Sequence, residues 1–239
     1  MRLDDPVCVR EQYATEHGLA ARKALYEEVD GDDAREIALA AVRDAAPHSV
    51  LEVGCGTGEL AVRLQADLDV RLIAIDQSAR MVEIARGRGV DAREGDVQEL
   101  AFGDSSFDVA VAAWMLFHVG DLDGGISELA RVLRPGGRLV AVTNYADHLY
   151  ELFALAGALE QRWPLSFGGE NGKELLSRHF ARVERRGANG TVTVRSANAI
   201  RAYLRSAERL APFADRLHEL QEPLVARRRQ AVFVAEKAL

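Results

Sequence analysis

The sequence predicts an α/β protein with a doubly wound, mostly parallel sheet. Segments with strand character and segments with helical periodicity alternate from residue 32 to about residue 143, as expected when helices cover both faces of a sheet. The strand segments are nearly continuous apolar runs, which is typical of strands buried on both faces. With 239 residues, 48% of them hydrophobic, the chain is long enough to bury one large core.

The first element of this alternation is a predicted helix at 32–45. Asp32 and Asp33 can cap its start, apolar residues recur at helical spacing, and Pro47 ends it. The segments that follow are strand 49–53, helix 59–65, strand 71–76, helix 78–86, strand 91–94, strand 107–113, helix 122–133 and strand 138–143. The RPGG sequence at 134–137 is typical of a turn, because proline presets one dihedral angle and glycine supplies a positive one.

The flanks do not follow this alternation. We expect residues 1–31 to form an N-terminal helical lid and residues 144–204 a helical insertion. Three more strands are predicted: 183–186 and 191–194, paired around a glycine turn at 187–190, and 231–236, which returns to the sheet edge. No repeat or low-complexity linker interrupts the chain, so residues 1–239 are interpreted as a single domain with a lid above its ligand face.

Composition restricts the partners. The net charge of -7 and the pI near 5.5 do not favour nucleic acid, whose phosphates attract basic surfaces. The basic run Arg227–Arg229 is interpreted as the solvated end of a helix. Cys55 lies in a glycine loop where a disulfide to Cys8 would obstruct the turn, which fits a reducing cytoplasm. We expect a cytoplasmic protein without a membrane segment or metal; nothing in the sequence specifies an oligomeric state.

The sequence VLEVGCGTGEL at 50–60 places Gly54, Gly56 and Gly58 directly after a strand. A tight glycine turn at the carboxyl end of a buried strand usually approaches a nucleotide. A dinucleotide fingerprint would read G-x-G-x-x-G, whereas these glycines are two apart and Glu59 adds a negative charge near any phosphate. A ligand with an adenosine and a cationic centre but no phosphate fits better, which describes S-adenosylmethionine.

Acidic residues at later strand ends support this ligand. Asp76 closes the strand at 71–76, where a carboxylate can accept hydrogen bonds from both ribose hydroxyls. Asp96 can accept from the adenine amino group, and the Val97 amide can donate to a ring nitrogen. Met81, on the helix after Asp76, can pack on the adenine face.

Together these segments resemble the class I S-adenosylmethionine-dependent methyltransferase family, in its ubiquinone-biosynthesis-like branch. The resemblance covers residues 49–143 and rests on VLEVGCGTGEL, Asp76, GDVQELAFGDSSFDVAVAAWMLFHV and LRPGGRLV in the right order. It implies a seven-stranded sheet. It also implies cofactor contacts: Glu52, Gly54, Cys55 and Gly56 to the methionine portion, Asp76 and Gln77 to ribose, Asp96 and Val97 to adenine, Ala113 and Trp114 under the sulfonium, and Tyr13 to the amino acid carboxylate.

The expected reaction is an in-line methyl transfer to a small organic acceptor, with S-adenosylhomocysteine as the second product. Such a transfer requires mainly alignment and exclusion of water. An acceptor that carries a proton would also need a base, for which His118 and His148 are the candidates. Two alternatives stay open: an NAD-dependent oxidoreductase on a related fold, and a non-catalytic cofactor-binding module.

Overall fold

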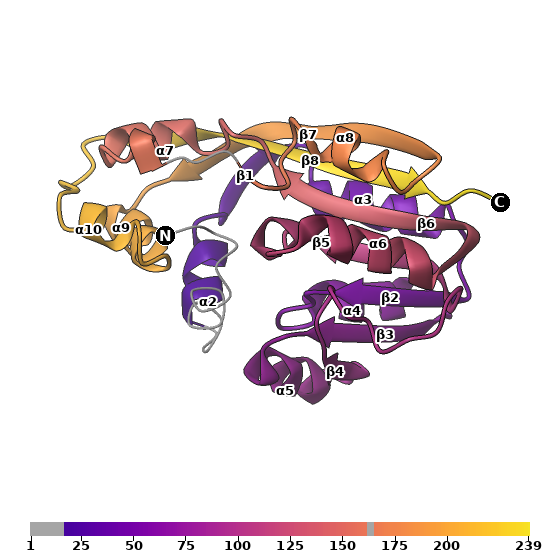
Figure 1. The fold of residues 1–239 in the computed structure, drawn as a ribbon. Coiled ribbons are helices and arrows are strands. Elements are labelled where there is room, and N and C mark those ends of the chain that lie inside the picture. Colours follow the sequence, from indigo (N-terminus) through magenta and orange to yellow (C-terminus); the bar gives the residue numbers. More distant parts are fainter. Residues whose placement is uncertain (1–16, 162–164) are drawn as a thin grey trace.

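The computed structural model describes residues 17–161 and 165–239, and within these residues it contains one eight-stranded sheet (Figure 1). The strands are β1 (Glu28–Gly31), β2 (Ser49–Val53), β3 (Arg71–Asp76), β4 (Ala92–Glu94), β5 (Phe107–Ala113), β6 (Leu133–Asn144), β7 (Arg182–Val194) and β8 (Leu224–Glu236). Their order across the sheet is β1-β7-β8-β6-β5-β2-β3-β4.

The described helices are α2 (His17–Ala24), α3 (Ala34–Arg43), α4 (Glu59–Asp67), α5 (Ala79–Gly87), α6 (Leu122–Val132), α7 (Tyr150–Leu155), α8 (Gly172–Leu176), α9 (Ala197–Arg205) and α10 (Ala211–Ala214), with short 3-10 turns η1 (Leu116–His118) and η2 (Leu159–Gln161). Side-chain caps start several of them. Asp33 accepts a hydrogen bond from the Arg35 amide at α3, and Ser78 accepts one from the Met81 amide at α5.

Five strands, β6, β5, β2, β3 and β4, are parallel and form the doubly wound part of the fold. All five residues of β2 are buried, and its side chains alternate between two cores. Val50 packs with side chains of α3, α4 and α5, whereas Leu51 and Val53 pack with side chains of α6. Helices therefore cover both faces, and the predicted α/β fold class is confirmed.

The other end of the sheet differs from the prediction. Strand β8 is antiparallel to both β6 and β7, so it lies inside the sheet instead of at its edge. Residues 28–31, predicted as part of a helical lid, form the edge strand β1, which raises the strand count from seven to eight. The RPGG sequence lies within β6, where Gly136 has φ of 73°.

Strand β7 runs through the predicted glycine turn at 187–190 without a break, paired to β8 along its full length. A side chain at Gly190 would collide with the carbonyl oxygen of Asp30, and one at Gly31 would collide with that of Asn189. The glycines here therefore allow close approach of the β1 and β7 backbones, a second use of glycine that sequence alone does not separate from a turn.

The helical additions gather at one end of the sheet. Side chains of α7, α9 and α10 share a core with inward-facing residues of β7 and β8, such as Val192 and Ala226. In Figure 1 these helices lie beyond the carboxyl ends of the parallel strands, with α2 beside them. The predicted helical insertion at 144–204 thus contains α7, η2, α8 and most of α9, but also β7. In the described part of the chain, every helix is too short or too polar to cross a bilayer.

Candidate functional site

A cavity of about 380 Å³ lies at the carboxyl ends of the parallel strands. Its walls come from the loops after β2, β3, β4 and β5, from α2, α3 and α9, and from the first half of β8. Ten of the predicted cofactor contacts line it: Glu52, Gly54, Cys55, Gly56, Asp76, Gln77, Asp96, Val97, Ala113 and Trp114. In an open parallel sheet this edge is where ligands bind.

The glycine loop forms a bare stretch of backbone on the cavity wall. Gly54, Gly56 and Gly58 all have positive φ, at 66°, 53° and 76°, a conformation that other residues adopt only with strain. A Cβ atom at Gly54 would lie 2.6 Å from the Cβ of Met115. At Gly56 the nearest atom would be a methyl of Leu19, 3.6 Å away. Gly54 is thus required for packing, and Gly56 keeps the cavity open.

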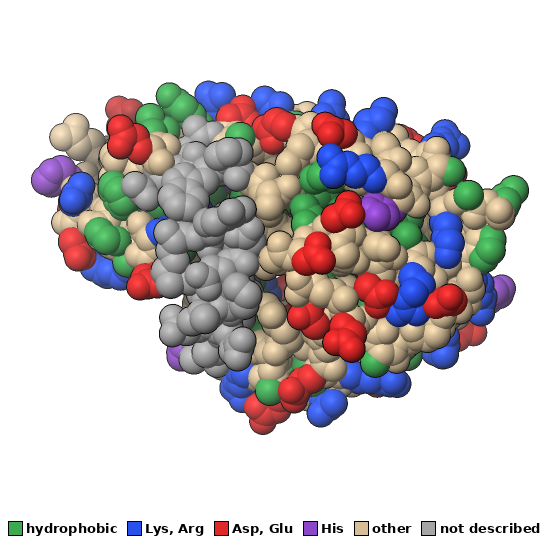
Figure 2. Space-filling view, in the orientation of Figure 1, with side chains coloured by type: hydrophobic (Ala, Val, Ile, Leu, Met, Phe, Trp, Pro, Cys, Tyr) green, Lys and Arg blue, Asp and Glu red, His purple; other side chains and the backbone are tan. Residues whose placement is uncertain are grey.

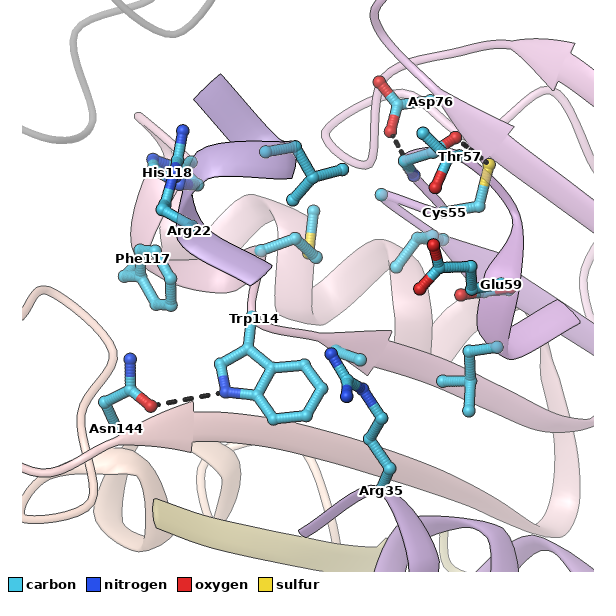
Figure 3. Close-up of a pocket in the computed structure, with 18 of the residues that line it drawn as sticks. Arg22, Arg35, Cys55, Thr57, Glu59, Asp76, Trp114, Phe117, His118 and Asn144 are labelled. Atoms are coloured by element: carbon cyan, nitrogen blue, oxygen red, sulfur yellow. Dashed lines mark hydrogen bonds between the residues drawn. The ribbon is translucent and has the colours of Figure 1, made fainter. Parts of the chain in front are cut away.

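Asp76 joins the end of β3 to this loop. Its Oδ2 accepts a hydrogen bond from the Gly56 amide at 2.8 Å (Figure 3). Its Oδ1 accepts one from the Ser78 amide at 2.9 Å. The side chain is buried, and this burial raises its pKa although the two amides act in the opposite direction. Each carboxylate oxygen keeps a second acceptor position, so Asp76 can hold the loop and still accept from a ligand.

Glu52 belongs to the cavity lining and is only 3% exposed. Among the described residues, its Oε2 has no hydrogen-bond partner. Burial, together with the nearby charge of Asp76, raises the pKa of Glu52 to about 8. Burial also raises the pKa of the Cys55 thiol. A buried carboxyl group with an unused oxygen is suited to a cationic ligand group, which would favour its ionised form.

Of the three residues predicted to contact adenine, two line the cavity and one does not. Asp96 is exposed at the loop after β4, where it accepts a hydrogen bond from the Gln98 amide at 2.9 Å, and Val97 beside it is buried. Both line the cavity. Met81 is fully buried within α5 and is not part of the lining. The shelf that was expected from Met81 therefore does not face the cavity in this structure.

Trp114 follows β5 with φ of 54°, a strained value for a residue with a side chain. Its Nε1 donates to Oδ1 of Asn144 at 3.3 Å, and the Arg35 guanidinium lies 5.4 Å from its ring centre (Figure 3). Asn144 Oδ1 also accepts from Gln230 Nε2 at 3.1 Å. The indole is therefore held between the end of β6 and the start of α3, and Gln230 of β8 fixes the Asn144 side chain that it contacts.

The two candidate histidines occupy different places. His118, in η1, lines the cavity with its ring 4.5 Å from that of Phe117. His148 is buried and does not line it. Its Nε2 is 2.8 Å from the hydroxyl of Tyr26, which does line the cavity, and its Nδ1 accepts from the Arg229 amide at 3.0 Å. Tyr13 lies outside the described residues.

Sequence reasoning missed the basic side chains of the cavity wall. These side chains come from α2, α3 and β8, and two tyrosines, from the turn after α2 and from α9, lie in the same lining: Arg22, Lys23, Arg35, Arg228, Tyr26 and Tyr203. The basic run 227–229 lies in strand β8, so its interpretation as a helix end was wrong. Strand alternation sends Arg228 to the cavity, while Arg227 pairs with Glu151 and Arg229 with Asp147. Only the strand assignment could have revealed this alternation.

Comparison with known proteins agrees with this geometry. Residues 51–141 match a family described as a methyltransferase domain. This match and the methyltransferase relatives described below confirm the resemblance to class I S-adenosylmethionine-dependent methyltransferases that was seen in the sequence. Its placement in the ubiquinone-biosynthesis-like branch stays a prediction.

Two curated relatives illustrate the similarity. The O-methyltransferase resE of Aspergillus sclerotiorum is 36% identical over 160 residues, which cover 62% of this chain and 60% of that protein. The malonyl-[acyl-carrier protein] O-methyltransferase of Hahella chejuensis is 33% identical over 140 residues, covering 56% and 48%. The chain spans about half the length of the curated relatives it matches.

Solved structures share the fold. The [4+2]-cyclase SpnF has a TM-score of 0.64 and 22% identity, covering 98% of this chain and 95% of that one. An S-adenosylmethionine-dependent methyltransferase from Thermotoga maritima has a TM-score of 0.55 and 24% identity, covering 85% and 89%. Because one of these neighbours is named as a cyclase, the fold alone does not identify the reaction.

Proposed function

We propose that this protein transfers the methyl group of S-adenosylmethionine to a small organic acceptor. The observation that carries the proposal is the unused oxygen of buried Glu52 beside the open glycine loop. A buried acid with an unsatisfied oxygen is costly unless a cation or donor reaches it. The ammonium group of the cofactor's methionine portion is such a cation.

The remaining cofactor contacts follow from the loops already described. We propose that Asp76 accepts hydrogen bonds from the ribose hydroxyls, with Gln77 beside it, and that Asp96 and Val97 bind adenine. Gly54, Cys55 and Gly56 would line the methionine portion, with Ala113 and Trp114 near the sulfonium. When bound, S-adenosylmethionine supplies an electrophilic methyl group. The chain's own contribution is alignment and exclusion of water, with α2 and α9 as a lid.

His118 is the better placed of the two candidate bases, because it lines the cavity directly. We propose that it accepts the acceptor's proton as the methyl group is transferred. The apolar side chains of Trp114, Met115 and Phe117 in the same lining suit an acceptor with an organic framework. On the face in Figure 2, lysine and arginine are interspersed with aspartate and glutamate among the described residues, which supports a small molecule over a nucleic acid.

The first experiment is calorimetric titration with S-adenosylmethionine, S-adenosylhomocysteine and NADH. We expect the two sulfur nucleosides to bind and NADH not to bind; the reverse would favour the oxidoreductase alternative. The second experiment supplies methyl-labelled cofactor with a panel of hydroxyl compounds and carboxylic acids, because the curated relatives above are named as O-methyltransferases. Release of S-adenosylhomocysteine in step with a labelled product would exclude a non-catalytic binding module.

A further inference from the structure

The cavity has opposite charges at its two ends. The carboxyl groups of Glu52, Asp76 and Asp96 lie at or just after the ends of β2, β3 and β4, whereas Arg35 and Arg228 come from α3 and β8. Strand β8 is three positions from β2 in the sheet, which is roughly 14 Å at the usual strand spacing. The acidic end suits the cationic cofactor, and the basic end is left for the acceptor.

Arg228 is the central feature of the basic end. It is only 6% exposed, and its Nη2 donates to the backbone carbonyl oxygens of Asp30 and Asp32. Across residues 17–161 and 165–239, no carboxylate forms an ion pair with it, and its Nε is buried without an acceptor. A buried charge without a counterion is strongly unfavourable. An anion in the cavity would supply the missing counterion.

Tyr26 adds a directed donor to this end. Because His148 Nδ1 accepts from the Arg229 amide, a neutral His148 carries its proton on Nε2 and donates it to the Tyr26 oxygen. The hydroxyl proton of Tyr26 is then available to the cavity. Burial raises the pKa of Tyr26, while the charges of Arg228, Arg35 and Arg22 oppose that rise, so the phenol stays protonated beside guanidinium groups.

Arg35 supplies a second positive charge. Its guanidinium lies over Trp114, and in the described part of the chain it forms no ion pair. Asp33 also belongs to the lining, but its carboxylate caps α3 through the Arg35 amide. Lys23, by contrast, is neutralised by Glu59. The buried guanidinium of Arg228, the hydroxyl of Tyr26 and the flanking Arg35 can together bind a planar group with one negative charge, such as a carboxylate.

We propose that the methyl acceptor carries a carboxylate, which binds Arg228 and Tyr26 at the β8 end of the cavity with Arg35 beside it. This inference rests on the proposed methyltransferase function and specifies its substrate class. The cofactor's own carboxylate has the same chemistry, so the experiment must separate the two sources.

The test is calorimetric titration of the protein saturated with S-adenosylhomocysteine, using benzoate and benzamide as probes. These molecules have the same shape and differ in charge. We expect benzoate to bind and benzamide to bind about tenfold more weakly or worse, because a charge-assisted hydrogen bond to a buried guanidinium is lost. In Arg228→Gln the preference for benzoate should disappear, while the affinity for S-adenosylhomocysteine should stay unchanged.

Arg227→Gln is the matched control, since it removes a positive charge from the adjacent residue, which pairs with Glu151 and is not part of the cavity lining. It should bind both probes as the unaltered protein does. Arg35→Gln changes an exposed position and provides a second variant if Arg228→Gln does not fold. It should weaken the binding of benzoate several-fold and leave the binding of benzamide unchanged.

Equal binding of benzoate and benzamide by the unaltered protein would overturn the proposal. A loss of S-adenosylhomocysteine affinity in Arg228→Gln with benzoate binding retained would assign Arg228 to the cofactor's carboxylate, and would overturn it too. Failure of S-adenosylhomocysteine to bind the unaltered protein would instead contradict the proposed function. In that case benzoate titration of the ligand-free protein still tests the anion site.

Discussion

Oδ2 of Asp76 accepts a hydrogen bond from the amide of Gly56 at 2.8 Å, so the acid at the end of β3 holds the loop that follows β2. The two segments are twenty residues apart in the chain. They meet because β2 and β3 are adjacent parallel strands whose carboxyl ends share one edge. The residue proposed to bind ribose therefore also shapes the loop proposed to bind the methionine portion.

Asp76→Ala should weaken S-adenosylhomocysteine binding by roughly 2 to 3 kcal/mol, because it removes charge-assisted contacts to the ribose. Asp76→Asn keeps one acceptor oxygen and should lose less. Calorimetry measures both affinities, and circular dichroism checks the fold. Asp91→Ala, an exposed aspartate before β4, is the control and should bind normally. Unchanged binding in Asp76→Ala would remove this residue from the site.

Glu52 should make stability depend on pH. Burial raises its pKa to about 8 from an ordinary value of 4.5, so between these values the folded protein holds a proton that the unfolded chain releases. The stability linked to this proton is fully present below pH 4.5 and is lost as the pH rises through 8. Glu52→Gln should abolish this component. Urea denaturation of the unaltered protein and of Glu52→Gln from pH 5 to pH 9 measures the free energy of unfolding at each pH. If the two proteins showed the same dependence on pH, the prediction would be contradicted.

His118 and His148 should affect turnover differently. If His118 accepts the acceptor's proton, His118→Ala should lower kcat by roughly 100-fold with cofactor affinity unchanged. His148→Ala removes the donor that orients Tyr26, so it should mainly raise the KM for the acceptor. Exposed His218 provides the control, and His218→Ala should behave as the unaltered protein. A kcat loss confined to His148→Ala would reverse these roles.

Gly54→Ala and Gly89→Ala separate backbone strain from crowding. Both glycines have positive φ, at 66° and 84°, so each alanine should incur a strain of about 1 to 2 kcal/mol. A Cβ at Gly54 would also collide with Met115, whereas one at Gly89 would meet nothing within 4 Å. Gly54→Ala should therefore lower the free energy of unfolding by about 1 to 3 kcal/mol more than Gly89→Ala does. It should also bind S-adenosylhomocysteine poorly. Equal free energies of unfolding for the two variants would contradict the packing account.

The parallel half of the fold was predictable because its strands carry their own signal. The bounds predicted for the strands at 71–76 and 107–113 are those of β3 and β5. Burial on both faces requires a continuous apolar run, which is visible in a single sequence. The antiparallel half carries a weaker signal. Strand β1 has no buried side chain, and the glycines of β7 resemble a turn although they serve its contact with β1.

The sequence by itself determined the local chemistry at the strand ends. It places glycines that permit positive φ after β2 and an acid at the end of β3, and it sets the order of these strand ends along the chain. These features depend on residues close together in the chain. Only the tertiary structure decided that Met81 is not part of the cavity lining, and that Glu52 keeps an unused oxygen and Arg228 has no counterion among residues 17–161 and 165–239. Burial and charge pairing depend on segments as distant as α3 and β8, and desolvation acts on a side chain only once those segments have packed around it.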